Sequence, residues 1–330
     1  MEVDSADSVI IGDHYFLGVL RINKMTEYEV VATGLRFPEG PIAMPDGSVL
    51  LVEIERGTLS RVHPSGEVEV VSDLGGGPNG AAIGPDGFCY ICNSGGFGWV
   101  DVDGQLFPNG VAEDYVGGRI ERVDLATGEF ERVYDSCDGH SLEGPNDIVF
   151  DRAGGFWFSD TGKIYQRKTT RGGIYHAATD GTQIRETLYP TECANGIALS
   201  PDEKTLYFSE TLNGRLWGFD VEAPGALAAG AATADPQNLL YAPGGHLGFD
   251  SMAVDSDGNI CQATLFTGGI SVVSPSGELI EFYDFPDPVV TNICFGGDDL
   301  RTAYITLSGT GQLVKMRWPR PGLAINFLYK

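Results

Sequence analysis

The chain alternates short apolar segments with short polar turns along most of its length. From Gly40 to Asp73 it reads GPIAM, PDG, SVLLVEI, ERG, TLSRVH, PSG and EVEVVSD. The apolar segments are rich in β-branched residues and are punctuated by glycine turns, which is typical of antiparallel strands. From Asp250 the same order recurs as DSMAVD, SDG, NICQAT, FTG, GISVVS, PSG and ELIEFYD. The pattern predicts two copies of a four-stranded meander.

Four other segments repeat the start of this unit, with an apolar strand, a polar turn and a second strand. They read NGAAIGPDGFCYICN, NDIVFDRAGGFWFSD, NGIALSPDEKTLYFSET and NICFGGDDLRTAYITLS. The first polar residues of the six copies are Glu39, Asn79, Asn146, Asn195, Asp250 and Asn292. Four-stranded units repeated around an axis form a β-propeller, whose closure avoids long exposed sheet edges. We expect an all-β fold, a six-bladed β-propeller with four-stranded antiparallel blades around a central channel. A β-solenoid or a pair of sandwiches explains six similar copies less well.

The sixth copy runs out of sequence after GQLVKMRWPRPG. We therefore expect YEVVATG, residues 28–34, to supply its outer strand and close the ring. Because each blade needs its neighbours to cover its faces, residues 28–330 are predicted to form a single domain, preceded by an N-terminal extension at 1–27. The Ala/Gly-rich stretch 222–237 is expected to be a surface loop.

Residues 94–118 form an insertion between the second and third strands of the second blade. Loops of this length are usually functional or disordered, and the aromatic residues Phe97, Trp99 and Phe107 argue against disorder. One interpretation is a lid that gives the substrate pocket an apolar wall. The other is a segment packed on the blade edge, and the sequence leaves both open.

Composition narrows the class of partner. The 330 residues include 46 acidic and 21 basic ones, a formal charge of -25, so nucleic acid and anionic membranes would be repelled. The sequence also has no membrane-length apolar stretch and no basic segment followed by an apolar one at its start. We expect a cytoplasmic protein that acts on a small molecule, with a homo-oligomer left open. The six cysteines are expected to be buried thiols, with Cys89 and Cys92 on opposite faces of one strand.

The polar residues at the strand starts carry the candidate chemistry. In a propeller the first strand of each blade lines the channel, so these residues converge at one end. Glu39, Asn146, Asn195 and Asp250 offer only oxygen ligands, which suit a hard cation such as Ca²⁺. Mg²⁺, Mn²⁺ and Zn²⁺ remain alternatives, zinc the least favoured. Each residue alone would be read as an ordinary turn residue, but four equivalent positions together favour a metal site.

These motifs resemble the senescence marker protein (SMP-30), regucalcin and gluconolactonase family of six-bladed propellers, which is related to the diisopropylfluorophosphatase type. The resemblance covers about residues 28–318 and is carried by FPEGPIAMPDG, GPNDIVFDRAGGFWFSDT, CANGIALSPDEKTLYFSET and GFDSMAVDSDGNICQAT. It implies that Glu39, Asn146, Asn195 and Asp250 bind a divalent metal, usually calcium, and that Asp250 also assists catalysis. Regucalcin-like members have a substrate-contacting arginine just ahead of the first asparagine, where this chain has Glu143, Gly144 and Pro145.

Several further residues are candidates for the site. Asn79 and Asn292 complete the set of strand starts and are expected to hydrogen-bond substrate or a metal-bound water. His246 and His140 lie on loops that lead into the blades of Asp250 and Asn146, and they are weaker candidates for substrate contacts. Strand alternation predicts that Asp147 turns away from the axis if Asn146 faces it, so that Asp147 would support the ligands from outside.

Together these features predict a divalent-metal-dependent hydrolase of a lactone, resembling gluconolactonase. The metal would polarise the carbonyl, and Asp250 would assist the attack of water. Two alternatives remain. One is phosphotriester hydrolysis or another metal-assisted reaction on the same scaffold. The other is a binding propeller without catalysis, which apolar residues at the strand starts would have favoured.

Overall fold

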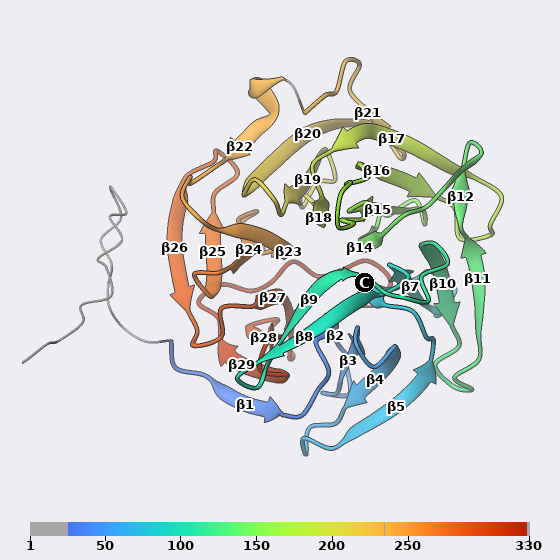
Figure 1. Ribbon diagram of the computed structural model, residues 1–330. Coiled ribbons are helices and arrows are strands. Elements are labelled where there is room, and N and C mark those ends of the chain that lie inside the picture. Colours follow the sequence, from blue (N-terminus) through green and yellow to red (C-terminus); the bar gives the residue numbers. More distant parts are fainter. Residues whose placement is uncertain (1–25, 234, 329–330) are drawn as a thin grey trace, which may run out of the picture.

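The computed structural model describes residues 26–233 and 235–328, and these form a six-bladed β-propeller (Figure 1). The predicted extension at 1–27 lies, up to residue 25, outside the described residues. The inner strands of the blades contact one another in a closed ring, β2 to β6, β14, β18, β23, β27 and back to β2. The predicted fold is confirmed.

Each blade is an antiparallel sheet whose strands follow from the inside outward. The first blade consists of β2 (Pro38–Ala43), β3 (Val49–Glu53), β4 (Thr58–Val62) and β5 (Val68–Asp73). The second consists of β6 (Pro78–Ile83), β7 (Cys89–Asn93), β10 (Arg119–Val123) and β11 (Phe130–Tyr134). The third consists of β14 (Pro145–Phe150), β15 (Phe156–Asp160), β16 (Gly172–Ala177) and β17 (Ile184–Thr191). The fourth consists of β18 (Ala194–Leu199), β19 (Thr205–Glu210), β20 (Arg215–Ala223) and β22 (Leu239–Tyr241). The fifth consists of β23 (Gly248–Val254), β24 (Ile260–Leu265), β25 (Gly269–Val273) and β26 (Leu279–Asp284). Smaller elements are the hairpins β8 (Phe97–Val102) with β9 (Gln105–Val111) and β12 (Ser136–Cys137) with β13 (His140–Ser141), the strand β21 (Ala226–Leu227) and the 3-10 helix η1 (Pro236–Asn238).

The sixth blade closes the ring with the two ends of the domain. It consists of β27 (Val290–Gly296), β28 (Thr302–Leu307), β29 (Gln312–Arg317) and β1 (Glu29–Ala32). Val30 pairs with Val314, and Lys315 forms an ion pair with Glu29 at 3.0 Å. The predicted outer strand at 28–34 is therefore confirmed.

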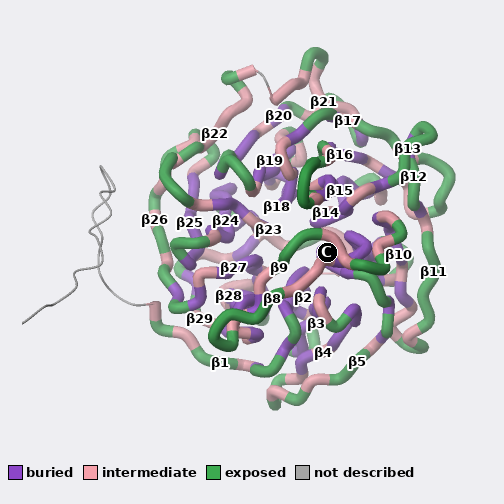
Figure 2. Tube along the Cα trace, in the orientation of Figure 1, coloured by how far each residue is buried: buried purple, intermediate pink, exposed green. Residues whose placement is uncertain are grey.

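Side-chain alternation explains why the second strands of the blades are almost uniformly buried. In β7, Cys89 and Ile91 pack toward the first blade, whereas Tyr90 and Cys92 pack toward the third. Both faces of a blade are therefore covered by its neighbours. Buried residues fill the body of each blade, while exposed and half-buried residues of the outer strands and turns form the rim (Figure 2). The six cysteines are free thiols, and Cys89 and Cys92 lie on opposite faces, as predicted.

The segment after β29 crosses one end of the channel. Leu323 N donates to Val254 O at 2.9 Å, and Asn326 Nδ2 donates to Phe150 O at 3.0 Å. A cavity of about 160 Å³ lies in the channel between this segment and Asn292. The opposite end of the channel is the end where the inner strands begin. No helix within the described residues is long and apolar enough to cross a membrane.

Candidate metal centre

The first strand of every blade carries its predicted hinge residue at the same register position. Each lies four residues before a residue that pairs at or next to the start of the second strand. Glu39, for example, precedes Ala43, which pairs with Val49, and Asp250 precedes Val254, which pairs with Ile260. The register shifts at this point in each blade, which is the mark of a β-bulge that re-aims side chains. The structure thus brings six residues to one end of the channel, which we call the hinge ring: Glu39, Asn79, Asn146, Asn195, Asp250 and Asn292.

Glycine and serine residues hold neighbouring blades close together at the ring. A Cβ on Gly80 would lie 2.4 Å from Asn146 O, and one on Gly196 would lie 2.6 Å from Asp250 O, so only glycine fits at either position. Ser209 Oγ accepts from Gly196 N at 3.1 Å and donates to Asp250 O at 2.8 Å. The backbone carbonyls of Asn146 and Asp250 are therefore in close contact with the blade before each of them.

Three oxygens of the predicted ligand set are buried without a hydrogen-bond partner. They are Glu39 Oε1, Asn146 Oδ1 and Asn195 Oδ1. A buried polar atom normally has a partner, and leaving it without one costs about 1–3 kcal/mol. A cation accepts lone pairs from oxygen ligands. Three such oxygens, from three blades in one ring, are therefore suited to bind a cation.

The carboxyl group of Glu39 is fixed on one side only. Its Oε2 accepts from Asn292 Nδ2 at 2.7 Å and from Gly40 N, which leaves Oε1 directed elsewhere. Burial raises the pKa of Glu39 well above its ordinary value, and the charges of Asp250 and Asp147 raise it further. These carboxylates form no ion pair with a described Lys or Arg. A divalent cation would supply the missing positive charge.

Thr211 sets the orientation of the Asn195 amide. Asn195 Nδ2 donates to Thr211 Oγ1 at 3.0 Å, and that hydroxyl donates to Phe249 O at 2.8 Å. The amide oxygen of Asn195 is then free to act as a ligand. Burial raises the pKa of Asp250 to about 7, against the opposing effect of a hydrogen bond from Asn195, and the charge of Asp147 adds to the rise.

Asp147 lies closer to the axis than strand alternation predicted. It lines the cavity beneath the ring, and its carboxylate accepts from Ile148 N at 2.9 Å and from Ile197 N of the next blade at 3.2 Å. The bulge at Asn146 and Asp147, which together face Ser159, interrupts the alternation on which the prediction rested. Burial raises the pKa of Asp147 to about 7.

The other predicted residues are distributed differently. Asn79 and Asn292 are buried members of the hinge ring, and Asn292 contacts Glu39 directly. His246 is exposed on the loop before β23 and stacks on Phe266, with ring centroids 4.6 Å apart. His140 lies in the short hairpin β12–β13, which Figure 2 places at the rim, away from the ring. The structure thus does not bring His140 to the other candidates.

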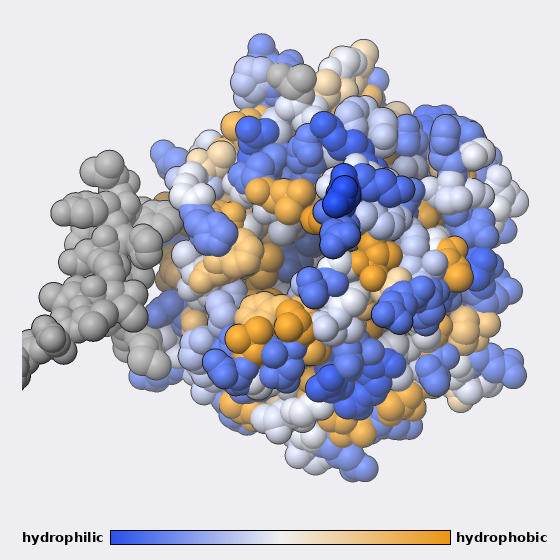
Figure 3. All heavy atoms as spheres, in the orientation of Figure 1, coloured by the Kyte–Doolittle hydropathy of each residue, from blue (hydrophilic) through white to orange (hydrophobic). Residues whose placement is uncertain are grey.

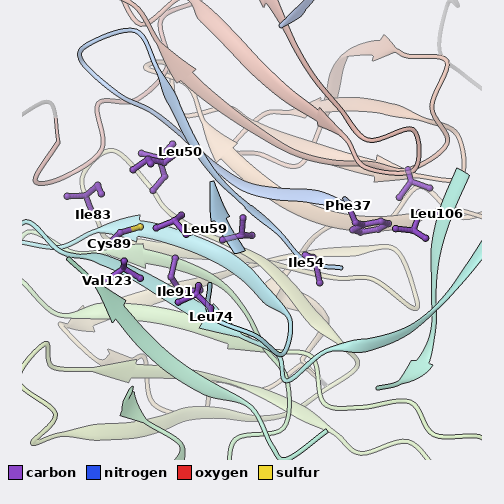
Figure 4. Packing of buried hydrophobic residues seen from close by; sticks show 13 residues of the cluster. Phe37, Leu50, Ile54, Leu59, Leu74, Ile83, Cys89, Ile91, Leu106 and Val123 are labelled. Atoms are coloured by element: carbon purple, nitrogen blue, oxygen red, sulfur yellow. The ribbon is translucent and has the colours of Figure 1, made fainter. Parts of the chain in front are cut away.

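The insertion 94–118 emerges at the hinge end, because β7 ends at Asn93 opposite Pro78. Its hairpin β8–β9 crosses the face of the propeller (Figure 1), and Leu106 N donates to Gly309 O in the sixth blade at 2.9 Å. Trp99 packs on Phe37, with ring centroids 5.0 Å apart. In Figure 4 Leu106 lies beside Phe37, which is two residues before the hinge residue Glu39.

Two residues in this site escaped the sequence interpretation. Thr211 follows a strand whose pattern indicates only burial, and its bond to Asn195 depends on how two strands of the blade align. Lys163 lies in the polar stretch GKIYQRKTTRG, which is typical of an exposed loop, yet it is only 2% exposed. Neither has a local sequence signal.

Comparisons with known proteins agree with this architecture. Residues 37–309 match the family model described as the SMP-30/gluconolactonase/LRE-like region. Lactonase drp35 of Staphylococcus saprophyticus is 31% identical over 260 residues, covering 76% of this chain and 70% of the relative. A gluconolactonase of Zymomonas mobilis is 26% identical over 310 residues, with 86% and 79% covered.

Solved structures share the fold. A gluconolactonase from Xanthomonas campestris superposes with a TM-score of 0.69 at 22% identity, over 88% of this chain and 89% of that one. Regucalcin from Agrobacterium tumefaciens, described as a calcium-binding protein, gives a TM-score of 0.69 at 21% identity, over 93% and 98%. With the family match across most of its length, the chain belongs to the SMP-30/gluconolactonase/LRE-like family.

Proposed function

We propose that this protein hydrolyses lactones at the hinge ring and requires a divalent cation, Ca²⁺ in the first place. The observation that carries the proposal is the set of three buried, unpartnered oxygens on Glu39, Asn146 and Asn195, next to the acidic Asp250. The relatives named lactonase and gluconolactonase support the choice of a cyclic ester as substrate.

The residues present fit such an ion. The four donors are two carboxylates and two carboxamides, and oxygen ligands of this kind are those that calcium prefers. No group of three or more His, Cys, Asp or Glu in a metal-binding arrangement occurs among the described residues, because half of this ligand set is asparagine. When bound, the ion supplies Lewis-acid polarisation of an ester carbonyl.

Asp250 is the residue we assign to proton transfer. One oxygen of its carboxylate could bind the ion while the other accepts a proton from water. In the proposed reaction water attacks the lactone carbonyl carbon and gives a proton to the Asp250 carboxylate. The ring C–O bond then breaks, and the proton passes to the departing alkoxide, so that one lactone and one water give one hydroxy acid. Asn79 and Asn292 are proposed to hydrogen-bond the substrate. Asn292 would do so while its side-chain amide also donates to the carboxylate of Glu39.

The β8–β9 hairpin is proposed to act as the lid of this site. Exposed apolar side chains lie on loops at the hinge face, and apolar surface surrounds the centre of that face in Figure 3. They belong to the insertion and to the turns after the second strands of three further blades: Val100, Val102, Val116, Ile164, Leu212 and Phe266. His246, stacked on Phe266, completes the proposed substrate contacts on this side.

A lactonase assay with controlled metal content tests the proposal. The chelator-treated protein is assayed by acid release on a panel of lactones that differ in ring size and polarity, before and after addition of Ca²⁺, Mg²⁺, Mn²⁺ or Zn²⁺. We expect hydrolysis to be lost on chelation and restored best by Ca²⁺. Activity that is unchanged by complete removal of divalent metal would exclude the proposed site.

A further inference from the structure

Lys163 is a buried lysine at the hinge face that has no role in the proposed chemistry. It lies in the loop between β15 and β16, and its side chain is buried. Its Nζ donates to Gly96 O at 3.0 Å and lies 4.4 Å from the ring centroid of Phe97 and 5.0 Å from that of Tyr115. No ion pair joins it to a carboxylate in the described part of the chain.

The three partners of Lys163 all belong to the insertion 94–118, and they come from both of its ends. Gly96 and Phe97 lie where the chain leaves the second blade, and Tyr115 lies where it returns. The two ends touch, because a Cβ on Gly95 would lie 2.6 Å from Gly117 O. Gly95 and Gly117 have φ values of +78° and +111°, a region that few other residues tolerate. The insertion therefore joins the blade through a narrow neck at Gly95 and Gly117.

The loop that carries Lys163 is held firmly to the third blade. Lys163 N donates to Thr170 Oγ1 at 2.7 Å, and Thr170 N donates to Lys163 O at 2.9 Å. The carboxylate of Asp160 accepts from the backbone N–H groups of Glu143, Gly144 and Gly162. This loop and the segment that leads directly into Asn146 thus form one unit.

The contacts of Lys163 offset the cost of burying its charge. An ammonium group over an aromatic face is attracted by the negative face of the ring, more strongly where water is excluded. Burial lowers the pKa of Lys163 to about 8, while the charges of Asp160 and Glu143 oppose the shift. The only described groups that its ammonium contacts directly are those of the neck.

We propose that Lys163 is the positioning residue that clamps the neck of the insertion and thereby holds the β8–β9 hairpin over the hinge ring. At its far end the hairpin has the backbone bond from Leu106 to Gly309 and the ring contact between Trp99 and Phe37. The contacts of Lys163 with Gly96, Phe97 and Tyr115 form the polar connection at the other end, where the insertion joins the second blade. Only the catalytic consequence of the clamp rests on the proposed function.

Hydrogen exchange measured by mass spectrometry tests the clamp without any substrate. In Lys163→Met, which keeps the length and loses the charge, we expect amide exchange in residues 97–111 to become at least tenfold faster, with exchange in β14–β16 unchanged. Lys163→Arg should restore slow exchange. Phe97→Leu, a second variant that removes one ring from the insertion side, should act in the same direction as Lys163→Met.

Lys168→Met is the matched control, because Lys168 is an exposed lysine on the same loop whose Nζ lies over Tyr165. Its exchange pattern should equal that of the unaltered protein. Unchanged exchange in 97–111 of both Lys163→Met and Phe97→Leu would overturn the clamp. If lactonase activity is found, Lys163→Met should raise KM several-fold with a smaller change in kcat; absence of lactonase activity would contradict the proposed function and leave the exchange result standing.

Discussion

The side-chain amide of Asn292 donates a hydrogen bond to the carboxylate of Glu39 at 2.7 Å, although 253 residues separate the two. They are the hinge residues of the last and first blades, so this bond joins β27 to β2, the two inner strands whose contact completes the ring. Asn292 also accepts from Ile293 N through Oδ1, which fixes the amide with its NH₂ toward Glu39. Closure of the propeller and orientation of a proposed ligand are thus achieved by the same contact.

We expect Asn292→Ala to weaken calcium binding by about 10- to 100-fold, the range found when a residue that orients a metal ligand is removed. Glu39 Oε2 would lose a donor and the carboxylate would be free to rotate. Calorimetric titration of the chelator-treated protein with Ca²⁺ measures the change. Asn292→Ala with undiminished affinity would show that Glu39 does not need this partner.

The proposed base is tested by Asp250→Asn. The amide can still offer an oxygen to the ion but cannot accept the proton of water, so we expect kcat to fall by about 10² or more at saturating Ca²⁺. The fold should be retained, since the change keeps the size of the side chain. Circular dichroism and thermal unfolding check this. Turnover equal to that of the unaltered protein would remove Asp250 from the catalytic role.

The buried carboxyls predict an unusual dependence of stability on pH. Burial raises the pKa of Asp147 and Asp250 to about 7, against about 3.9 in an unfolded chain. Each binds its proton more readily when folded, so its contribution to stability increases as pH falls from above 7 toward 4. In metal-free protein we expect the free energy of unfolding, relative to Asp250→Asn, to rise by on the order of 2 kcal/mol from pH 8 to 5.5.

Calcium should reverse this order. Because the ion requires deprotonated carboxylates, the increase in melting temperature produced by Ca²⁺ should be large at pH 8 and small at pH 5.5. Differential scanning calorimetry at both pH values, with and without Ca²⁺, gives the comparison. Equal stabilisation by Ca²⁺ at the two pH values would mean that Asp147 and Asp250 do not titrate in this range.

Deletion of residues 97–112 tests the lid. The shortened chain can be joined by glycines, since Gly95 and Gly117 are already in contact. We expect KM for the true substrate to rise at least several-fold, because the apolar wall is lost, while calcium affinity remains the same. Unchanged KM and kcat would identify the hairpin as a segment that only packs across the face.

The sequence predicted the repeat, the closing strand and the six hinge positions because each has a local pattern of strand, turn and polar residue. It predicted that Asp147 turns away from the axis, because alternation was assumed to continue through the strand start, where the structure has a bulge. The partners Thr211 and Lys163 could not be predicted. Their contacts with Asn195 and Gly96 join segments 16 and 67 residues apart, and such contacts are set by the packing of strands and loops.

Oxygens from several blades are proposed to bind one divalent ion, and calcium titration of variants in the hinge ring measures this binding. Isothermal titration calorimetry on metal-free protein should give one Ca²⁺ per chain, with at least tenfold weaker binding in Asn146→Ala and Asn195→Ala. Asn213→Ala is the control, since this exposed asparagine in the same blade as Asn195 bonds to Glu210 outside the ring; it should bind normally. Absence of calcium binding, or equal affinity in all three variants, would contradict the account.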